Sequence, residues 1–318
     1  MKYLLINFLF LATFNLSAQS AEDIERYFTF FNNQHIAVNN LAMQYLQYSV
    51  HSTDMALIEN KRQSVIEQLN KSIQEVEAMP TLKDDDQLKP TALEVFRSFL
   101  GSFEMDFVEV LQLKANSQSS YESMEAYFQS RKDAEKKVDE AADRYLEAQK
   151  AFAEKHDIQL QLAEENQDVQ DLNRLNNYHQ AIFMRYFKIL MRNAEFTEAL
   201  NTQDATEIAK TRNILLIESE AQLKSLAAMP AFQGESIYKP AAVELITTIR
   251  DLAKTDYLTL EQIMHKPGAE RTQEDANQFN SIVQGLQTKV MPLNQKANEQ
   301  GNELLKKYVP KPRMTQRL

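Results

Sequence analysis

The chain has 318 residues, among them 5 Gly, 8 Pro and no Cys. The lack of cysteine excludes disulfides and thiolate metal sites, and so few turn-forming residues exclude a β-rich fold. The formal net charge of −10 argues against nucleic acid or an anionic lipid surface as a partner. The sequence therefore predicts an all-α protein that is held together by burial of apolar surface alone.

The first 18 residues have the pattern of a secretory signal peptide. Lys2 gives a basic start, residues 4–12 are apolar apart from Asn7, and residues 16–18 (Leu-Ser-Ala) end on a small residue. The apolar run is shorter than the ~20 residues that span a bilayer, so we expect cleavage and no remaining membrane span. Without cysteine there is no site for lipid attachment. We therefore expect a bacterial protein exported to the periplasm, the outer surface or the medium.

Residues 22–157 predict a first helical unit. Its first two helices are expected at about 22–50 and 54–79, because Pro80 disfavours a continuing helix. Pro90 suits the first turn of a third helix, where apolar residues recur at heptad spacing. These residues are Leu93, Phe96, Leu100, Phe103, Phe107 and Val110.

Ser119 and Glu122 are spaced as a capping box, which predicts a fourth helix from there to about His156. In the second half of the chain, Thr272 to Asp275 supplies the corresponding cap. Long helices joined by short loops favour antiparallel, up-and-down packing.

A second unit, residues 168–309, repeats this scheme. Met79-Pro80 recurs as Met229-Pro230, an offset of 150 residues (229 − 79 = 150). The same offset relates Asp54 to Asp204, Arg62 to Arg212, Lys89 to Lys239 and Pro90 to Pro240. Ordered matches across a whole unit indicate an internal duplication. We therefore predict two tandem up-and-down four-helix-bundle-like units, with one long interleaved helical bundle as the alternative.

Two further segments complete the expected organisation. Residues 158–167 link the units, and because they hold neither Gly nor Pro, the link is either a short kinked turn or one continuous helix. Residues 310–318 form a basic tail with Lys311, Arg313 and Arg317, which we expect to be a frayed end.

A repeated Asn-Asn-x-His sequence supplies the candidate binding residues. An offset of 144 (176 − 32 = 144) relates Asn32, Asn33 and His35 to Asn176, Asn177 and His179. Metal sites in di-iron bundles need a Glu three residues before the His. Asn takes that position before each of these histidines, so we expect no metal or other cofactor. Histidines in equivalent places are better explained as buried or interfacial polar residues. The Asn pairs are either a polar layer that fixes helix register or a small-ligand recognition point.

Three local features have simpler explanations. The aromatic residues Tyr27, Phe28, Phe30 and Phe31 are expected in the core rather than at an interface. Residues 84–86, all Asp, lack the spacing of a calcium loop and are expected to form a solvated turn. The loops that end at Pro90 and Pro240 are either plain helix connections or a paired recognition surface.

Residues 228–235 (Ala-Met-Pro-Ala-Phe-Gln-Gly-Glu), 239–245 (Lys-Pro-Ala-Ala-Val-Glu-Leu) and 152–156 (Phe-Ala-Glu-Lys-His) resemble a family of exported bacterial helical proteins. That family is named from a leptospiral surface protein. The resemblance covers both units, and it implies a helical fold and a place in the cell envelope. It supplies no catalytic residues, and Gly234 has no counterpart in the first unit.

No enzyme signature is present: the sequence has no Gly-rich phosphate loop, no Gly-x-Ser-x-Gly and no His-Glu-x-x-His. We therefore expect a non-enzymatic cell-envelope protein that binds another macromolecule, an envelope protein, through a helix face or a bundle end. The alternative is a periplasmic small-ligand or metal-binding module that uses the repeated Asn-Asn-x-His positions. The sequence leaves the oligomeric state open.

Overall fold

The computed structural model describes residues 9–10, 18–52, 54–83, 85, 87–161 and 167–309. These residues form long helices and one pair of two-residue strands, so the prediction of an all-α protein is confirmed. The chain divides into two compact units: unit 1 is residues 1–174 with 308–318, and unit 2 is residues 175–307. Each unit is described by itself.

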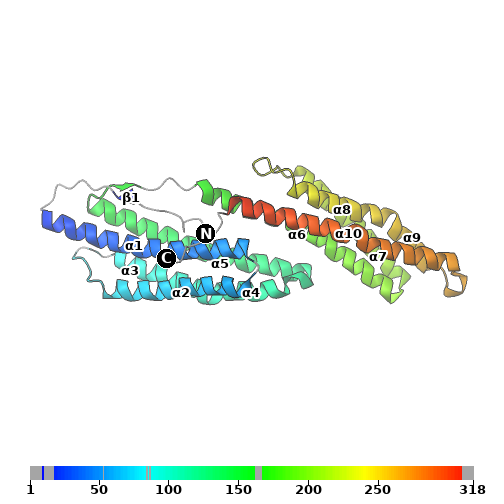
Figure 1. The fold of residues 1–318 in the computed structure, drawn as a ribbon, viewed down its shortest axis with the longest axis horizontal. Coiled ribbons are helices and arrows are strands. Elements are labelled where there is room, and N and C mark those ends of the chain that lie inside the picture. The colour runs from blue at the N-terminus through cyan, green and yellow to red at the C-terminus, as the bar shows by residue number, and fades with distance from the viewer. Residues whose placement is uncertain are drawn as a thin grey trace, which may run out of the picture. The chain divides into compact units, whose positions relative to one another are not determined.

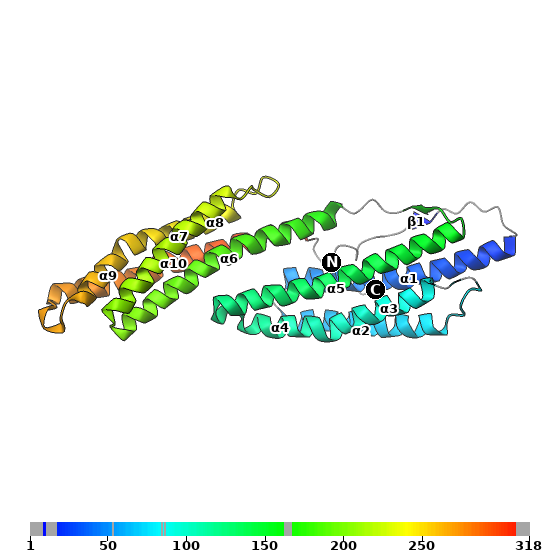
Figure 2. The same ribbon diagram turned by 180° about the vertical axis from the view of Figure 1, so that it is seen from behind.

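Unit 1 consists of four helical segments that lie alongside one another (Figures 1 and 2). They are α1 (Ala18–His51), α2 (Met55–Ala78), a composite third helix, and α5 (Tyr121–Lys155). The third helix runs through α3 (Leu88–Gly101), the π-helical segment η1 (Ser102–Asp106), α4 (Phe107–Asn116) and the 3₁₀ turn η2 (Ser117–Ser119). The strands β1 (Leu9–Phe10) and β2 (Leu160–Gln161) pair antiparallel.

Aromatic side chains fill the core of unit 1. Tyr27, Phe28 and Phe31 are at most 2% exposed, so the prediction that this cluster belongs to the core is confirmed for them, and Phe30 packs edge-on against Phe31. Phe96 and Phe103 of the predicted heptad series are at most 1% exposed. Burying each such ring contributes about 1.5–3 kcal/mol to the stability of the unit.

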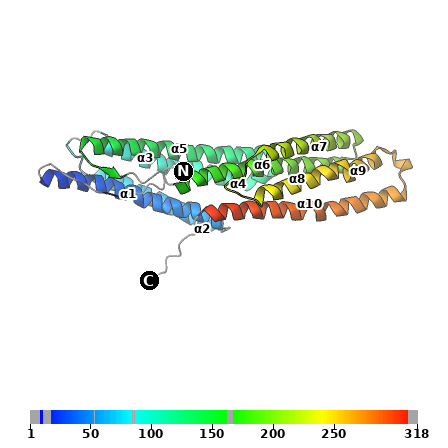
Figure 3. The same cartoon turned by 90° about the horizontal axis from the view of Figure 1, so that it is seen from above.

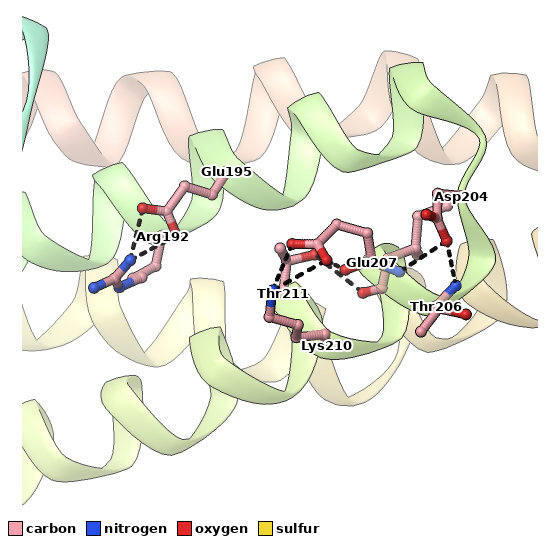
Figure 4. A network of polar contacts seen from close by, with 8 residues as sticks. Arg192, Glu195, Asp204, Thr206, Glu207, Lys210 and Thr211 are labelled. Atoms are coloured by element: carbon pink, nitrogen blue, oxygen red, sulfur yellow. Dashed lines mark hydrogen bonds and ion pairs between the residues drawn. The ribbon is translucent and has the colours of Figure 1, made fainter.

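Helix starts follow the cap residues that the sequence carries. Asp54 accepts from the N–H groups of Ala56 and Leu57 at 3.0 and 3.1 Å, and Asp204 repeats the arrangement at the next unit's second helix (Figure 4). Each such cap contributes about 1 kcal/mol. The cap of α5 lies one residue later than predicted: Ser120, not Ser119, accepts from the N–H of Ser123 at 3.0 Å.

The continuous-helix alternative for the link between the units is wrong. Asp157 adopts φ 54°, and the N–H of Ile158 bonds the carbonyl of Ala153 at 2.8 Å. This bond spans five residues and follows Asp157, which has a left-handed backbone conformation. The arrangement is a Schellman motif, and it ends α5 at Lys155. The expected linker then enters β2, and residues 162–166 lie outside the described residues, as do the predicted basic tail and most of the predicted signal peptide.

Unit 2 is built from α6 (Gln167–Thr202), α7 (Ala205–Ala228), α8 (Tyr238–Lys254), α9 (Asp256–His265), the 3₁₀ turn η3 (Gly268–Glu270) and α10 (Gln273–Tyr308). The division between the units falls inside α6, so residues 167–174 belong to unit 1. Thr272 and Asp275 form the predicted cap, with reciprocal bonds of 2.9 and 3.2 Å. Figure 3 shows α10 along one edge of unit 2, beside α8 and α9.

Ion pairs join neighbouring helices of unit 2. Lys188 of α6 pairs with Glu218 of α7 at 3.0 Å, and Lys296 of α10 pairs with Glu244 of α8 at 2.6 Å.

Among the residues that the structure describes, no helix has the length and apolar character needed to cross a membrane.

Candidate functional site

The first Asn-Asn-x-His sequence lies on α1 inside unit 1. His35 is 4% exposed and Asn32 is 8% exposed, whereas Asn33 points to solvent. The His35 ring meets the ring of Tyr145 edge-on at 4.9 Å, and its Nε2 lies 3.2 Å from Nδ2 of Asn39. Asn32 and His35 therefore belong to the core and not to an open binding surface.

These two residues form part of a buried polar layer between α1 and α5. Within the described residues, Asn32 Oδ1, His35 Nδ1, Asn39 Oδ1 and both amide atoms of Gln149 have no hydrogen-bond partner. The rings of Phe28 and Phe152 stack near one end of the layer, and the ring of Tyr145 meets His35 within it. Buried polar atoms without partners cost about 1–3 kcal/mol each, so ordered internal water is the expected occupant.

Burial lowers the pKa of His35 to about 4 from its ordinary value of 6.5. In the unfolded chain, the imidazole of His35 is therefore protonated below about pH 6.5, whereas in the folded chain it is protonated only below about pH 4. Stability from the neutral imidazole is complete above pH 6.5 and falls as the pH drops toward 4, by up to about 3 kcal/mol.

We expect this loss to appear in urea unfolding measured between pH 7 and pH 5.5, above the range where most carboxylates titrate. His35→Gln should remove most of the slope, since glutamine keeps a polar group in the layer but does not titrate. A variant with the same slope as the parent chain would contradict the assignment to His35.

The second Asn-Asn-x-His sequence does not occupy the equivalent place in unit 2. Asn176 is half-buried, Asn177 is exposed, and the half-buried His179 stacks on Tyr238 at 5.1 Å. A Cβ added at Gly301 would lie 2.9 Å from His179 Nε2, so His179 packs against this glycine. The two histidines lie in different layers of their units, and the sequence-based equivalence between them is wrong.

The reason for this error is visible at the neighbouring tyrosines. Tyr178 donates to Glu235 at 2.9 Å, as Tyr27 donates to Asp85 at 2.5 Å. These contacts align Tyr178 with Tyr27, so the residue after it, His179, corresponds to Phe28 and not to His35. The short sequence match was therefore out of register by two helical turns.

The connections that end at Pro90 and Pro240 are closed by the same contacts in both units. Asp85 accepts from the N–H groups of Leu88 and Lys89 at 2.7 and 3.0 Å, and Glu235 caps Tyr238 and Lys239 in the same way. Because Asp85 is only 9% exposed, the prediction of a solvated turn is wrong for this residue. Asp84 and Asp86 lie outside the described residues. These contacts, which fix the conformation of each connection, are sufficient to explain why the two loops are similar.

A small cavity with both apolar and polar lining residues opens at the end of unit 2 where α6 meets α7 and α9 meets α10. Its volume is about 240 Å³, with a floor of Leu200, Ile263, Met264 and Phe279. The first three are buried and Phe279 is half-buried. Exposed Gln203, Ala276 and Asn280 lie at the rim. We call this site the end pocket.

Two ionic side chains fix the wall of the end pocket. Arg271 donates from Nε to the carbonyl of Lys266 and from Nη2 to that of Met264, both at 3.0 Å, which closes the end of α9. Asp275 is 8% exposed and bonds Lys266 at 2.6 Å, and this contact is the main reason that the pKa of Asp275 falls to about 2. These bonds hold Arg271 and Asp275 in place, so a guanidinium lies beside the apolar floor.

Sequence reasoning missed the end pocket. The signal that it overlooked is a run of residues 276–288 without a single charge, in a chain that is 25% charged. Depletion of charge on an accessible helix is typical of the core of a protein interface. In unit 1 the corresponding helix buries Met124 and Phe128, at 4% and 8% exposure, so it leaves less apolar surface accessible.

A larger groove on unit 1 has a different character. It measures about 740 Å³ between η1–α4 and α5, and it is lined by both carboxylates and lysines. Lys137 pairs there with Asp106 at 2.6 Å, and Lys136 pairs with Glu140 at 3.5 Å. No group of three or more His, Asp or Glu side chains suited to a metal ion occurs among the described residues.

No family model, curated protein or solved structure matches this chain. The resemblance to exported helical surface proteins therefore stays a prediction. The end pocket and the helix beside it are therefore the features of the molecule that bear on function.

Proposed function

We propose that this chain is an exported, non-enzymatic protein of the bacterial cell envelope that binds another protein through the end pocket of unit 2. The signal-peptide pattern at residues 1–18 supports the exported address. The net charge of −10 supports a protein partner over nucleic acid.

The size and lining of the end pocket carry the proposal. Its volume of about 240 Å³ is below the ~300–1,000 Å³ of small-molecule sites, and its apolar floor is surrounded by the polar residues Gln203, Arg271, Asp275 and Asn280. A cavity of this kind fits one large apolar side chain. Single anchors that fill such pockets dominate the binding energy of many protein interfaces.

Neighbouring side chains restrict the chemistry of the partner segment. Arg271 lines the end pocket and supplies a charged hydrogen-bond donor, so an acceptor on the partner beside the apolar anchor is favoured. The uncharged residues 276–288 continue from the pocket along α10. An amphipathic helix with one large apolar anchor and few charges around it fits these features best.

A second candidate function is the recognition of a small polar ligand in unit 1. The five unpaired polar atoms of the layer around His35 favour it. A ligand there should raise the melting temperature of the parent chain but not that of His35→Ala. An equal melting shift in both chains would exclude this role for the layer.

A crosslinking experiment in the producing cells tests the proposed function. A photoreactive residue at Asn280, on the pocket rim, should give a discrete protein adduct, whereas one at the exposed Gln295 of the same helix should not. Ala276→Trp places a large side chain over the pocket and should abolish the adduct. Ala276 is exposed, so this change leaves the core untouched.

Asn277→Trp is the matched control, because Asn277 is exposed on the same turn of α10 and does not line the pocket. Its adduct should match that of the parent chain. An adduct at Asn280 that survives Ala276→Trp, or the absence of any adduct, would contradict the proposal.

A further inference from the structure

The helices α5 and α10 close their units in the same way, so their positions can be compared. Ser120 caps α5 and Thr272 caps α10, which gives an offset of 152 (272 − 120 = 152). The same offset pairs Tyr145 with Ala297, and each of these residues is 0% exposed. Unit 1 therefore shows which positions of this helix the shared fold is able to bury.

The first half of α10 packs more loosely than the matching half of α5. Five side chains of α5 before Tyr145 are at most 8% exposed: Met124, Phe128, Ala134, Val138 and Ala141. The equivalent positions of α10 hold two exposed residues, Ala276 and Asn280, and three half-buried ones, Leu286, Val290 and Leu293. Between residues 276 and 296, no side chain that the structure describes is buried. Little buried contact therefore holds this half of the helix in place.

Pro292 lies at the boundary between this half of α10 and the buried half that follows it. Proline has no N–H, so the carbonyl of Thr288, four residues earlier, lacks the donor of a regular helix. The equivalent residue of α5 is Glu140, so the interruption belongs to unit 2 alone. Beyond it, Ala297 and Leu304 are at most 5% exposed. The helix is thus anchored on one side of Pro292 and loosely held on the other.

Two ion pairs connect the loosely held half to the two ends of α9. Lys266 binds Asp275 at 2.6 Å, and Lys289 binds Asp256 at 2.8 Å. Both lysine side chains are exposed, and ion pairs of this kind contribute little to stability and are screened by salt. A segment held mainly by such contacts opens more readily than the core beside it.

We propose that residues 273–291 form a lid that opens and closes as one unit, with Pro292 as its boundary, while the rest of unit 2 stays folded. Four residues of this lid line the end pocket: Asp275, Ala276, Phe279 and Asn280. The end pocket is therefore complete only when the lid is closed. A partner anchored there binds the closed state alone, so its binding shifts the lid toward closure. This coupling rests on the proposed function, whereas the lid itself does not.

Hydrogen exchange of the purified full chain, in low concentrations of urea, tests the lid without any partner. Overlapping peptides from residues 276–291 should share one opening free energy and one urea dependence, because they open together. After correction for intrinsic rates, their exchange should be about tenfold or more faster than that of residues 297–304 of the same helix.

Pro292→Ala should slow the exchange of residues 276–291 by about tenfold, because alanine restores the donor for the carbonyl of Thr288 and joins the lid to the rest of the helix. Pro240→Ala is the matched control. Pro240 lies in the first turn of α8, where a backbone N–H has no partner within the helix. The control should therefore leave exchange in α10 unchanged.

Three results would overturn the proposal. The first is equal protection of residues 276–291 and 297–304. The second is protection that rises gradually along residues 276–291, which would mean fraying from the start of the helix. The third is unchanged exchange of the lid in Pro292→Ala. Failure of the crosslinking at Asn280 would count against the proposed function alone, because the lid is measured in the free chain.

Discussion

Replacing Arg62 by methionine is expected to lower the free energy of unfolding of unit 1 by about 3 kcal/mol. Arg62 is 5% exposed, and it binds both carboxylate oxygens of Glu59 at 2.6 and 2.8 Å. The hydrogen bond to Arg62 is the main reason that the pKa of Glu59 is lowered. The substitution removes these bonds and also the only side-chain contact described for the carbonyl of Phe103.

That carbonyl needs a partner because of the π-helical segment η1. The N–H of Phe107 bonds the carbonyl of Ser102 instead of that of Phe103, which leaves Phe103 without its usual helical partner. Nη1 of Arg62 donates to it. Methionine fills a similar volume but has no donor, so a buried carbonyl would remain unpaired at a cost of about 1–3 kcal/mol.

In unit 2, an arginine likewise binds a backbone carbonyl where the third helix is interrupted. Thr255 interrupts the third helix between α8 and α9, and Nη1 of Arg212 donates to the carbonyl of Ala253 at 3.2 Å. Arg212→Met should therefore destabilise unit 2 by a similar amount. Arg97→Met is the matched control: Arg97 is 58% exposed in its pair with Glu77, and such a pair contributes less than about 1 kcal/mol.

Urea unfolding, with hydrogen exchange of peptides from α2 to α4, measures the effect in unit 1. A loss in Arg62→Met no larger than that in Arg97→Met would show that the carbonyl of Phe103 finds another partner, and it would contradict this account.

Asp85→Ala is expected to destabilise unit 1 by about 3 kcal/mol. Asp85 accepts from three backbone N–H groups at the start of α3 and from the hydroxyl of Tyr27. Burial, together with this bond, raises the pKa of Tyr27 above its ordinary value, so the phenol stays protonated and donates. Alanine removes the cap, which contributes about 1–2 kcal/mol, and leaves the hydroxyl proton of Tyr27 without its acceptor.

The second unit provides the control for this substitution. Glu235 fills the same role with one more methylene group, so Asp85→Glu should retain most of the stability that Asp85→Ala loses. Thermal unfolding followed by circular dichroism compares the two. Equal losses in both variants would mean that the carboxylate does not act as a cap for α3.

Most of the helices could be predicted from the sequence because the relevant signals are local. Pro80 and Pro230 mark helix ends, Asp54 and Asp204 act as caps, and heptad spacing places Phe96 and Phe103 in the core. The interruption of the third helix left no comparable signal. A π-type turn replaces one backbone bond by another, and Arg62, a tertiary partner, binds the carbonyl that this leaves free.

The candidate site was less predictable. The match between Asn32 and Asn176 suggested equivalent positions, but helix register is decided by contacts such as Tyr178 with Glu235, which lie 57 residues apart. The end pocket brings Leu200 of α6 to Phe279 of α10, and no local pattern encodes that approach. The charge-free run on α10 was the one local sign of an interface.

Native mass spectrometry of the full chain, purified gently from the envelope of its host, tests the proposed function most directly. The parent chain and Asn277→Trp should each carry the mass of one additional protein, and Ala276→Trp should not. A parent chain that carries only small molecules would contradict the proposal. A protein partner that remains bound to Ala276→Trp would contradict it as well.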